Sequence, residues 1–154
     1  MTAKHAADGT TELVVTQQVA APIHDVWAAW TSVEGLARWW WPHWPDTVYV
    51  MEARVGGRWS ARSEQGGSGV EGEVVALDEP HVLELTWRWG GERVEDLVRV
   101  ELVETDSGTS ITVRHRTPSG GTDDYRQGWE FVLGNLGALS DGGAHEDAGP
   151  GASG

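Results

Sequence analysis

A run of period-two segments joined by short glycine turns is the feature that most constrains the fold of this chain. Apolar and polar side chains alternate in six segments, at residues 47–53, 58–63, 70–77, 81–89, 94–104 and 110–116. Such alternation is typical of strands that bury one face. The connections between the segments, many of them rich in glycine, are too short for the crossovers that parallel strands need. The sequence therefore predicts an antiparallel meander.

The segment before the meander predicts one more strand and two short helices. Residues 11–19 alternate like the later strands, and Pro22 favours a helix start because proline is preferred at the first helical position. Apolar residues then recur at helical spacing, first at Ile23, Val26, Trp27 and Trp30, and again at Val33, Leu36, Ala37 and Trp40. Thr31 or Ser32 can cap the second helix, and Pro42 ends it.

The last periodic element predicts a long helix from about Thr122 to Ser140. Its apolar stripe consists of Tyr125, Trp129, Val132, Leu133, Leu136 and Leu139. Three glycines, Gly128, Gly134 and Gly137, interrupt the helix, and each costs about 1 kcal/mol relative to alanine. Their presence indicates that something approaches the helix closely. Two explanations stay open, a packed neighbour and a ligand.

Length and composition predict a single domain at residues 11–140. A chain of 154 residues has room for one ordinary domain, and the absence of cysteine fits a reducing compartment. The small and polar residues at 1–10 and 141–154 show no apolar pattern, so we expect both ends to be disordered. The sequence has neither a signal-peptide pattern nor an apolar run of about 20 residues, and we expect a cytoplasmic protein.

The acidic balance argues against several classes of partner. A formal net charge of −13 repels phosphate backbones and anionic lipid heads, so we expect neither nucleic acid nor membrane as a partner. The sequence lacks a nucleotide-binding glycine loop with its lysine, and it lacks a nucleophile elbow. His24, His43 and His81 do not have metal-ligand spacing, so we predict surface positions for them and neither metal nor cofactor.

The ten tryptophans are the compositional anomaly of the chain. Small cores are usually filled by Leu, Ile and Val, whereas tryptophan is large, rigid and carries an N–H that needs a partner. Packing so many indoles without voids is difficult. Some of them are therefore expected to line a space instead of filling it.

Six motifs in the same order resemble a known family. They are APIHDVWAAWT at 21–31, RWWWP at 38–42, VGGRW at 55–59, DEPHVLELTW at 78–87, GTSITVRH at 108–115 and GW at 128–129. With the order of elements, they resemble the START-like superfamily and, within it, the subfamily named after the activator of Hsp90 ATPase. The resemblance implies an α+β helix-grip fold, in which a curved antiparallel sheet with two short helices wraps around a long C-terminal helix.

A nearer resemblance is carried by RWWWP, GGRW and the pair Trp87-Arg88. These are similar to the calicheamicin self-resistance proteins of enediyne producers. Proteins of that kind bind a reactive apolar natural product and are cleaved by it, one protein molecule for each drug molecule. The resemblance implies a reactive glycine in the cavity, and the sequence does not identify which glycine that is.

In a helix-grip fold the cavity lies between sheet and last helix, so strand alternation and the helix stripe assign its lining. The predicted ligand-binding residues are Trp59, Leu85, Trp87, Trp89, Val98, Val100, Val113, His115, Tyr125, Trp129, Val132 and Leu133. Trp40, Trp41 and Trp44 are expected at the cavity mouth. A mostly apolar lining with a few polar groups is the usual composition of a small-molecule site. The alternative is that the same residues form a packed core.

Asp96, His115 and Tyr125 are the candidate catalytic residues, because their positions in strand and helix all predict inward side chains. A carboxylate could orient the imidazole, which could then act as a base or bind a ligand. The alternative is a structural histidine whose hydrogen bonds are satisfied within the protein.

Three functions follow from these observations. The first is non-enzymatic binding of an apolar polycyclic small molecule by a monomer or weak homodimer, giving natural-product resistance by sequestration or self-sacrifice. The second is a polyketide cyclase or aromatase. The third is an Hsp90-associated interaction protein, which the family name suggests. Fold alone does not choose among them.

Overall fold

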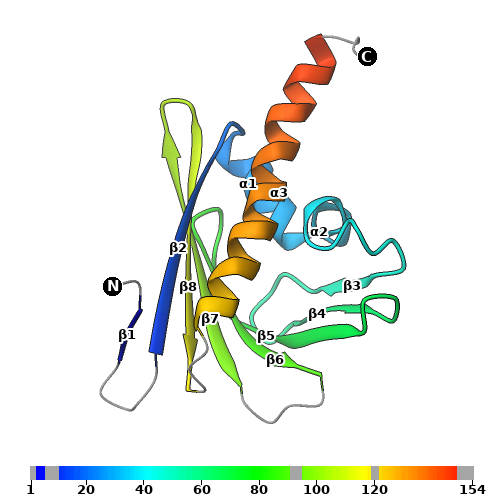
Figure 1. Cartoon of the computed structure of the whole chain (residues 1–154). Coiled ribbons are helices and arrows are strands. Elements are labelled where there is room, and N and C mark those ends of the chain that lie inside the picture. The colour runs from blue at the N-terminus through cyan, green and yellow to red at the C-terminus, as the bar shows by residue number, and fades with distance from the viewer. Residues whose placement is uncertain (1–2, 6–10, 91–94, 119–121, 149–154) are drawn as a thin grey trace.

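The fold is an eight-stranded antiparallel sheet with three helices (Figure 1). The computed structural model describes residues 3–5, 11–90, 95–118 and 122–148. The strands are β1 (Ala3–His5), β2 (Thr11–Val19), β3 (Val48–Met51), β4 (Arg58–Ser63), β5 (Ser68–Asp78), β6 (Val82–Trp89), β7 (Asp96–Thr105) and β8 (Gly108–Thr117). The helices are α1 (Ile23–Thr31), α2 (Val33–Trp39) and α3 (Thr122–Ala148). The predicted α+β helix-grip fold is confirmed.

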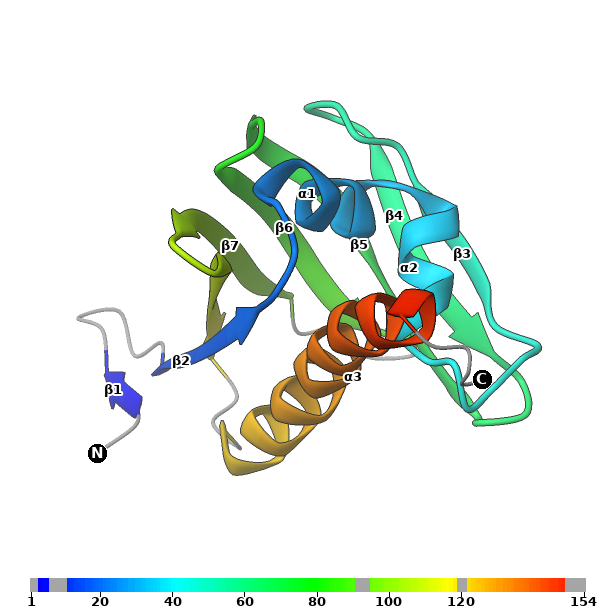
Figure 2. The same ribbon diagram turned by 90° about the horizontal axis from the view of Figure 1, so that it is seen from above.

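The spatial order of the strands is β1-β2-β8-β7-β6-β5-β4-β3. Strands β3 to β8 form the predicted meander, and β2 pairs along its whole length with β8, so the first long strand lies beside the last one. Helix α3 runs across the concave side of the sheet, and α1 and α2 lie on that same side (Figures 1 and 2). The residues between helix and sheet form the core.

Two helix starts show how local chemistry sets the boundaries. The side chain of Ser32 accepts a hydrogen bond from the Gly35 N–H at 2.9 Å, so the predicted cap of α2 is confirmed. Pro22 lies one position earlier than expected, as the N-cap of α1, where its carbonyl accepts the N–H groups of Asp25 and Val26. Both arrangements supply a partner to backbone groups that a helix end leaves open.

Both chain ends differ from the expectation of disorder. Residues 3–5 form β1, because the backbone of this short segment pairs with the outer edge of β2 at residues 11–13. Helix α3 continues to Ala148 instead of ending near Ser140, and its last turns project beyond the sheet (Figure 1). Residues 1–2, 6–10 and 149–154 lie outside the described residues.

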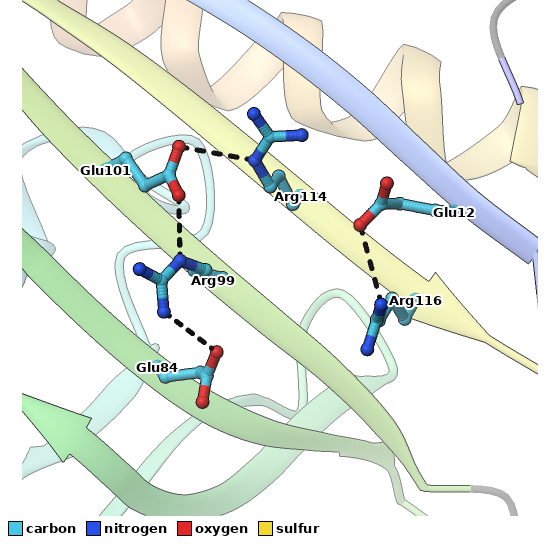
Figure 3. Close-up of polar contacts among 6 residues, drawn as sticks. All are labelled: Glu12, Glu84, Arg99, Glu101, Arg114 and Arg116. Atoms are coloured by element: carbon cyan, nitrogen blue, oxygen red, sulfur yellow. Dashed lines mark hydrogen bonds and ion pairs between the residues drawn. The ribbon is translucent and has the colours of Figure 1, made fainter. Parts of the chain in front are cut away.

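The outward face of the sheet carries charged side chains, as the alternation predicts. Six of them form ion pairs across three neighbouring strands and β2 (Figure 3): Glu12, Glu84, Arg99, Glu101, Arg114 and Arg116. Arg99 is central, with its Nε 2.7 Å from Glu101 and its Nη1 3.3 Å from Glu84. Hydrogen bonding by Arg99 lowers the pKa of Glu101 below its ordinary value. Opposite charges on adjacent strands support the sheet from its solvent side.

Candidate functional site: an aromatic pocket between sheet and helix

A pocket of about 90 Å³ lies between the sheet and α3. Its lining combines the end of α2, strand β6 and the first half of α3: Trp40, Trp41, Trp87, Trp89, Tyr125, Gly128, Trp129 and Val132. Six of these eight residues are aromatic, and none of the eight is charged. Strand alternation places Trp87 and Trp89 on the inward face of β6, and a spacing of four places Tyr125 and Trp129 on one face of α3.

The pocket is one side of a continuous cluster of indole rings. Nine of the ten tryptophans are joined by ring contacts with centroids 4.7 to 6.4 Å apart. Trp40 is the hub, with contacts to Trp30, Trp59, Trp87 and Trp129 as well as to its sequence neighbours. Most of these pairs are edge-to-face or tilted, which is the arrangement that ring quadrupoles favour. Many of the indoles therefore fill space, and only some border the pocket.

Four of the five pocket-lining indoles have N–H groups that are bonded within the protein or buried. Trp129 donates to Nδ1 of His115 at 2.9 Å, and Trp89 donates to the Tyr125 hydroxyl at 3.3 Å. The indole nitrogens of Trp40 and Trp87 are buried, and neither has a hydrogen-bond partner in the described structure. Because these nitrogens are inaccessible, the surface that those two rings offer to a ligand is carbon.

Asp96, His115 and Tyr125, the three candidate catalytic residues, do come together. His115 is completely buried on β8, with Nε2 2.8 Å from Oδ2 of Asp96, and its ring stacks on Tyr125 with centroids 4.2 Å apart. The indole of Trp129 can only donate, so Nδ1 of His115 must be the acceptor and carry no proton. Nε2 then carries the proton and donates it to Asp96. The indole thus sets the tautomer of the imidazole.

This hydrogen-bonding pattern differs from that of a general base. In a catalytic pair, one imidazole nitrogen binds the carboxylate and the other faces the substrate. Here the second nitrogen of His115 is occupied by Trp129, so no ring nitrogen is left for a substrate. The described geometry favours the structural interpretation of this histidine.

Seven of the fifteen residues predicted for the ligand site and its mouth line the pocket. They are Trp40, Trp41, Trp87, Trp89, Tyr125, Trp129 and Val132. The others do not border it. Leu85, Val98, Val100, Val113, His115 and Leu133 are buried in the core behind the pocket, and the Trp59 indole donates to the carbonyl of Thr86 at 2.8 Å. Alternation identifies the inward face of a strand, but it does not tell which inward residues meet a void.

Trp44, expected at the mouth, instead anchors the loop between α2 and β3. Its ring packs against Gly66 in the β4–β5 hairpin, where a Cβ would collide with the indole. Beside it, Asp46 accepts hydrogen bonds from the Ser63 hydroxyl at 2.7 Å and from the N–H groups of Glu64 and Gln65 at 2.9 and 3.0 Å. These hydrogen bonds lower the pKa of Asp46 below its ordinary value, and the bond from the Gln65 N–H has the largest effect. The loop that carries the pocket wall is thereby tied to the hairpin.

Gly128 is the one pocket residue that the predicted set omits. A Cβ at Gly128 would meet nothing within 4 Å, so the missing side chain is part of the pocket volume. Gly134 also faces open space but does not line the pocket, whereas a Cβ at Gly137 would lie 3.1 Å from the side chain of Gln17 on β2. The two explanations for the helix glycines therefore divide: a void at Gly128 and close packing at Gly137. The presence of a glycine at position 128, inside a predicted helix, was the sequence signal that could have added this residue to the predicted set.

A larger hollow of about 510 Å³ lies on the outer face of the sheet. It is lined mainly by charged side chains, among them Arg62, Arg88 and Glu71. Both arginines bind the carboxylate of Glu71, Arg62 at 2.7 Å and Arg88 at 3.0 Å. Their hydrogen bonds lower the pKa of Glu71, and the bond from Arg88 has the larger effect. Because these charges neutralise one another in an exposed groove, this hollow is a weaker candidate than the aromatic pocket.

The described residues contain no group of three or more side chains able to hold a metal ion. His24, His43 and His81 are exposed, as predicted. No helix in the described part of the chain is long and apolar enough to span a membrane.

The fold defines a helix-grip protein, and comparisons with known proteins give its family. Residues 20–141 match the model of the family described as activator of Hsp90 ATPase homolog 1-like protein, and the chain belongs to that family. The predicted subfamily is thus confirmed. A comparison with curated proteins finds no match.

Several solved structures share the fold. Protein CV1439 from Chromobacterium violaceum is 20% identical with a TM-score of 0.71, covering 84% of this chain and 96% of its own. CalU16 from Micromonospora echinospora is 24% identical with a TM-score of 0.70, covering 89% and 81%. DynU16, from the dynemicin biosynthetic locus, is 22% identical with a TM-score of 0.74; 86% of this chain matches 48% of that one. At these identities the likeness concerns the fold.

Proposed function

We propose that this protein binds an apolar aromatic small molecule in the pocket between β6 and α3, without catalysing a reaction. The observation that carries the proposal is the lining of the pocket, six aromatic side chains and a glycine that leaves room beside them. An apolar site of this kind gains affinity from burying ligand surface.

The pocket is too small to hold a polycyclic ligand without a movement of its wall. Sites for drug-sized ligands are typically about 300–1,000 Å³, and this one is about 90 Å³. A polycyclic ligand must therefore displace part of the wall. Trp41 stands on the loop between α2 and β3, held by Asp46 and by the Tyr49 hydroxyl, which accepts the Trp41 backbone N–H at 3.1 Å. We propose that this loop moves outward when such a ligand enters.

The finer role that we propose is resistance to an enediyne-type natural product, by sequestration or by self-sacrifice. The RWWWP and GGRW motifs support it, and so does the structural likeness to DynU16 of the dynemicin biosynthetic locus. For the sacrificial version, the glycine to be attacked is Gly128, the only glycine among the described lining residues.

Titration with a panel of polycyclic metabolites, enediynes included, tests the proposal. Tryptophan fluorescence and amide NMR shifts report binding, and Gly128→Leu, which fills the pocket, should abolish both responses. Gly134→Leu is the matched control, because it places the same side chain on α3 outside the pocket. Unchanged spectra across the panel, or equal binding by the two variants, would contradict the proposal. Mass spectrometry after enediyne exposure distinguishes an intact complex from a chain cleaved at Gly128.

A further inference from the structure

We infer that the pocket recognises a small alkylated ammonium group, so that its natural ligand carries a cationic methylated amine as the part that enters the pocket. This inference rests on the proposed binding function and names the chemical class of the ligand. It follows from the size of the pocket, the orientation of its rings and the charge around it.

The size of the pocket fits a compact group and not a fused ring system. A volume of about 90 Å³ corresponds to roughly three water molecules at about 30 Å³ each. A trimethylammonium or dimethylammonium head occupies space on that scale. The remainder of a larger ligand would extend past Trp89, Tyr125 and Gly128, the lining residues that are partly or fully exposed.

The rings of the pocket form a cage of the kind that binds such cations. Six aromatic side chains surround it: Trp40, Trp41, Trp87, Trp89, Tyr125 and Trp129. Aromatic faces carry the negative part of the ring quadrupole, and cages of Trp and Tyr are the usual recognition device for quaternary ammonium ions.

The orientation of the indole N–H groups favours a cation over an acceptor-bearing ligand. A pocket designed for a carbonyl or ether oxygen would direct donors inward. Here Trp129 donates its N–H to His115, and Trp89 donates its N–H to Tyr125. The indole nitrogens of Trp40 and Trp87 are buried. Two of the five lining indoles thus use their N–H groups within the protein, and two more have indole nitrogens that are not accessible.

The charge behind the cage has the sign that a cation needs. The carboxylate of Asp96 is 4% exposed, and its Oδ1 has no hydrogen-bond partner in the described structure. Asp96 lies opposite Trp87 in the pairing of β6 with β7, and His115 joins it to Trp129. No cationic side chain is among the described lining residues, and the net charge of the chain is −13. The buried carboxylate of Asp96 and the acidic balance of the chain would both favour a bound cation.

A pair of isosteric ligands separates charge from shape. The probes are choline and its neutral carbon isostere, in which a tert-butyl group replaces the trimethylammonium head, each titrated by NMR. We expect choline to bind about tenfold more tightly or better, a difference of about 1.4 kcal/mol, because cation–π attraction acts on the charged head alone. The preference should persist at 1 M salt (about 3 Å screening length), which suppresses attraction by the overall charge.

Two tryptophan variants then assign the preference to the cage. Trp89→Leu should reduce the preference for choline severalfold, and Trp89→Phe should retain part of it. Phe131→Leu is the control, because Phe131 is an exposed aromatic residue of α3 that does not line the pocket. Equal affinity for the two isosteres, a preference lost at high salt, or one unchanged in Trp89→Leu would overturn the inference.

The outcomes also separate this inference from the proposed function. If polycyclic metabolites bind and Gly128→Leu blocks them while choline shows no preference, the cation inference fails and the binding function stands. If neither the metabolites nor choline binds, both fail.

Discussion

The indole N–H of Trp129 and the imidazole Nδ1 of His115 are 2.9 Å apart, joining the first half of α3 to β8 between two buried rings. Through His115 the bond extends to Asp96 at the start of β7. Helix, sheet and a buried carboxylate are thus joined by two hydrogen bonds directly behind the pocket.

Replacing Trp129 by phenylalanine should expose the energetic role of this bond. Trp129→Phe leaves Nδ1 of His115 buried without a donor, at a cost of about 1–3 kcal/mol. Trp30→Phe is the control, since the Trp30 N–H is buried and already without a partner in the described structure, so that variant loses similar volume and no hydrogen bond. Urea denaturation should show the larger loss for Trp129→Phe. The nitrogen chemical shifts of His115 should change tautomer pattern in that variant; similar stabilities and unchanged shifts would refute the assignment.

The three helix glycines should respond differently to alanine. Gly128→Ala and Gly134→Ala should each raise the free energy of unfolding by up to about 1 kcal/mol, because the helix gains propensity and the new Cβ meets open space. Gly137→Ala should gain less, since its Cβ must displace the Gln17 side chain. Thermal unfolding measures all three. Equal gains would show that Gly137 is not a packing glycine.

The ion pairs of the outer face predict a pH dependence of stability. The folded-state pKa of Glu101 is lowered from its ordinary 4.5, chiefly by Arg99. Its stabilisation is therefore fully present above that ordinary value and is lost as the pH falls through the lower folded-state pKa. Glu101→Gln should be less stable than the native chain at pH ~7, by about 0.2–1 kcal/mol because the pairs are partly exposed.

The difference should shrink as the pH falls below 4.5. Urea titrations at several pH values measure it, with Glu104→Gln on the exposed end of β7 as the control. A difference that stays constant with pH would mean that the charge of Glu101 is not its source.

Asp46 should control how readily the pocket wall moves. Asp46→Ala removes the acceptor for three donors of the β4–β5 hairpin, which frees the loop that carries Trp41 and Trp44. Amide hydrogen exchange at Glu64 and Gln65 should accelerate, and a polycyclic ligand should associate faster. Asp78→Ala, an exposed aspartate at the other end of β5, should change neither. Unchanged association in Asp46→Ala would mean that the ligand enters by another route.

The sequence reasoning reached the fold because period-two alternation and glycine turns are local signals. It could not locate the void. Leu85 and Trp87 have the same inward parity on β6, yet only Trp87 borders the pocket. That distinction depends on how α3 and the loop after α2 pack against the sheet. Likewise, no local pattern indicates that Trp44 would rest on Gly66, a contact between segments about 20 residues apart that decides which tryptophans are free to face a ligand.

The nine connected indoles have an optical consequence. Rings with centroids 4.7 to 6.4 Å apart exchange excitation energy faster than they emit, so the cluster absorbs and fluoresces as a coupled array instead of as separate chromophores. A molecule that quenches one pocket ring would then dim light collected by all nine. Binding of the proposed ligand is therefore expected to be readable in dilute solution without any added label.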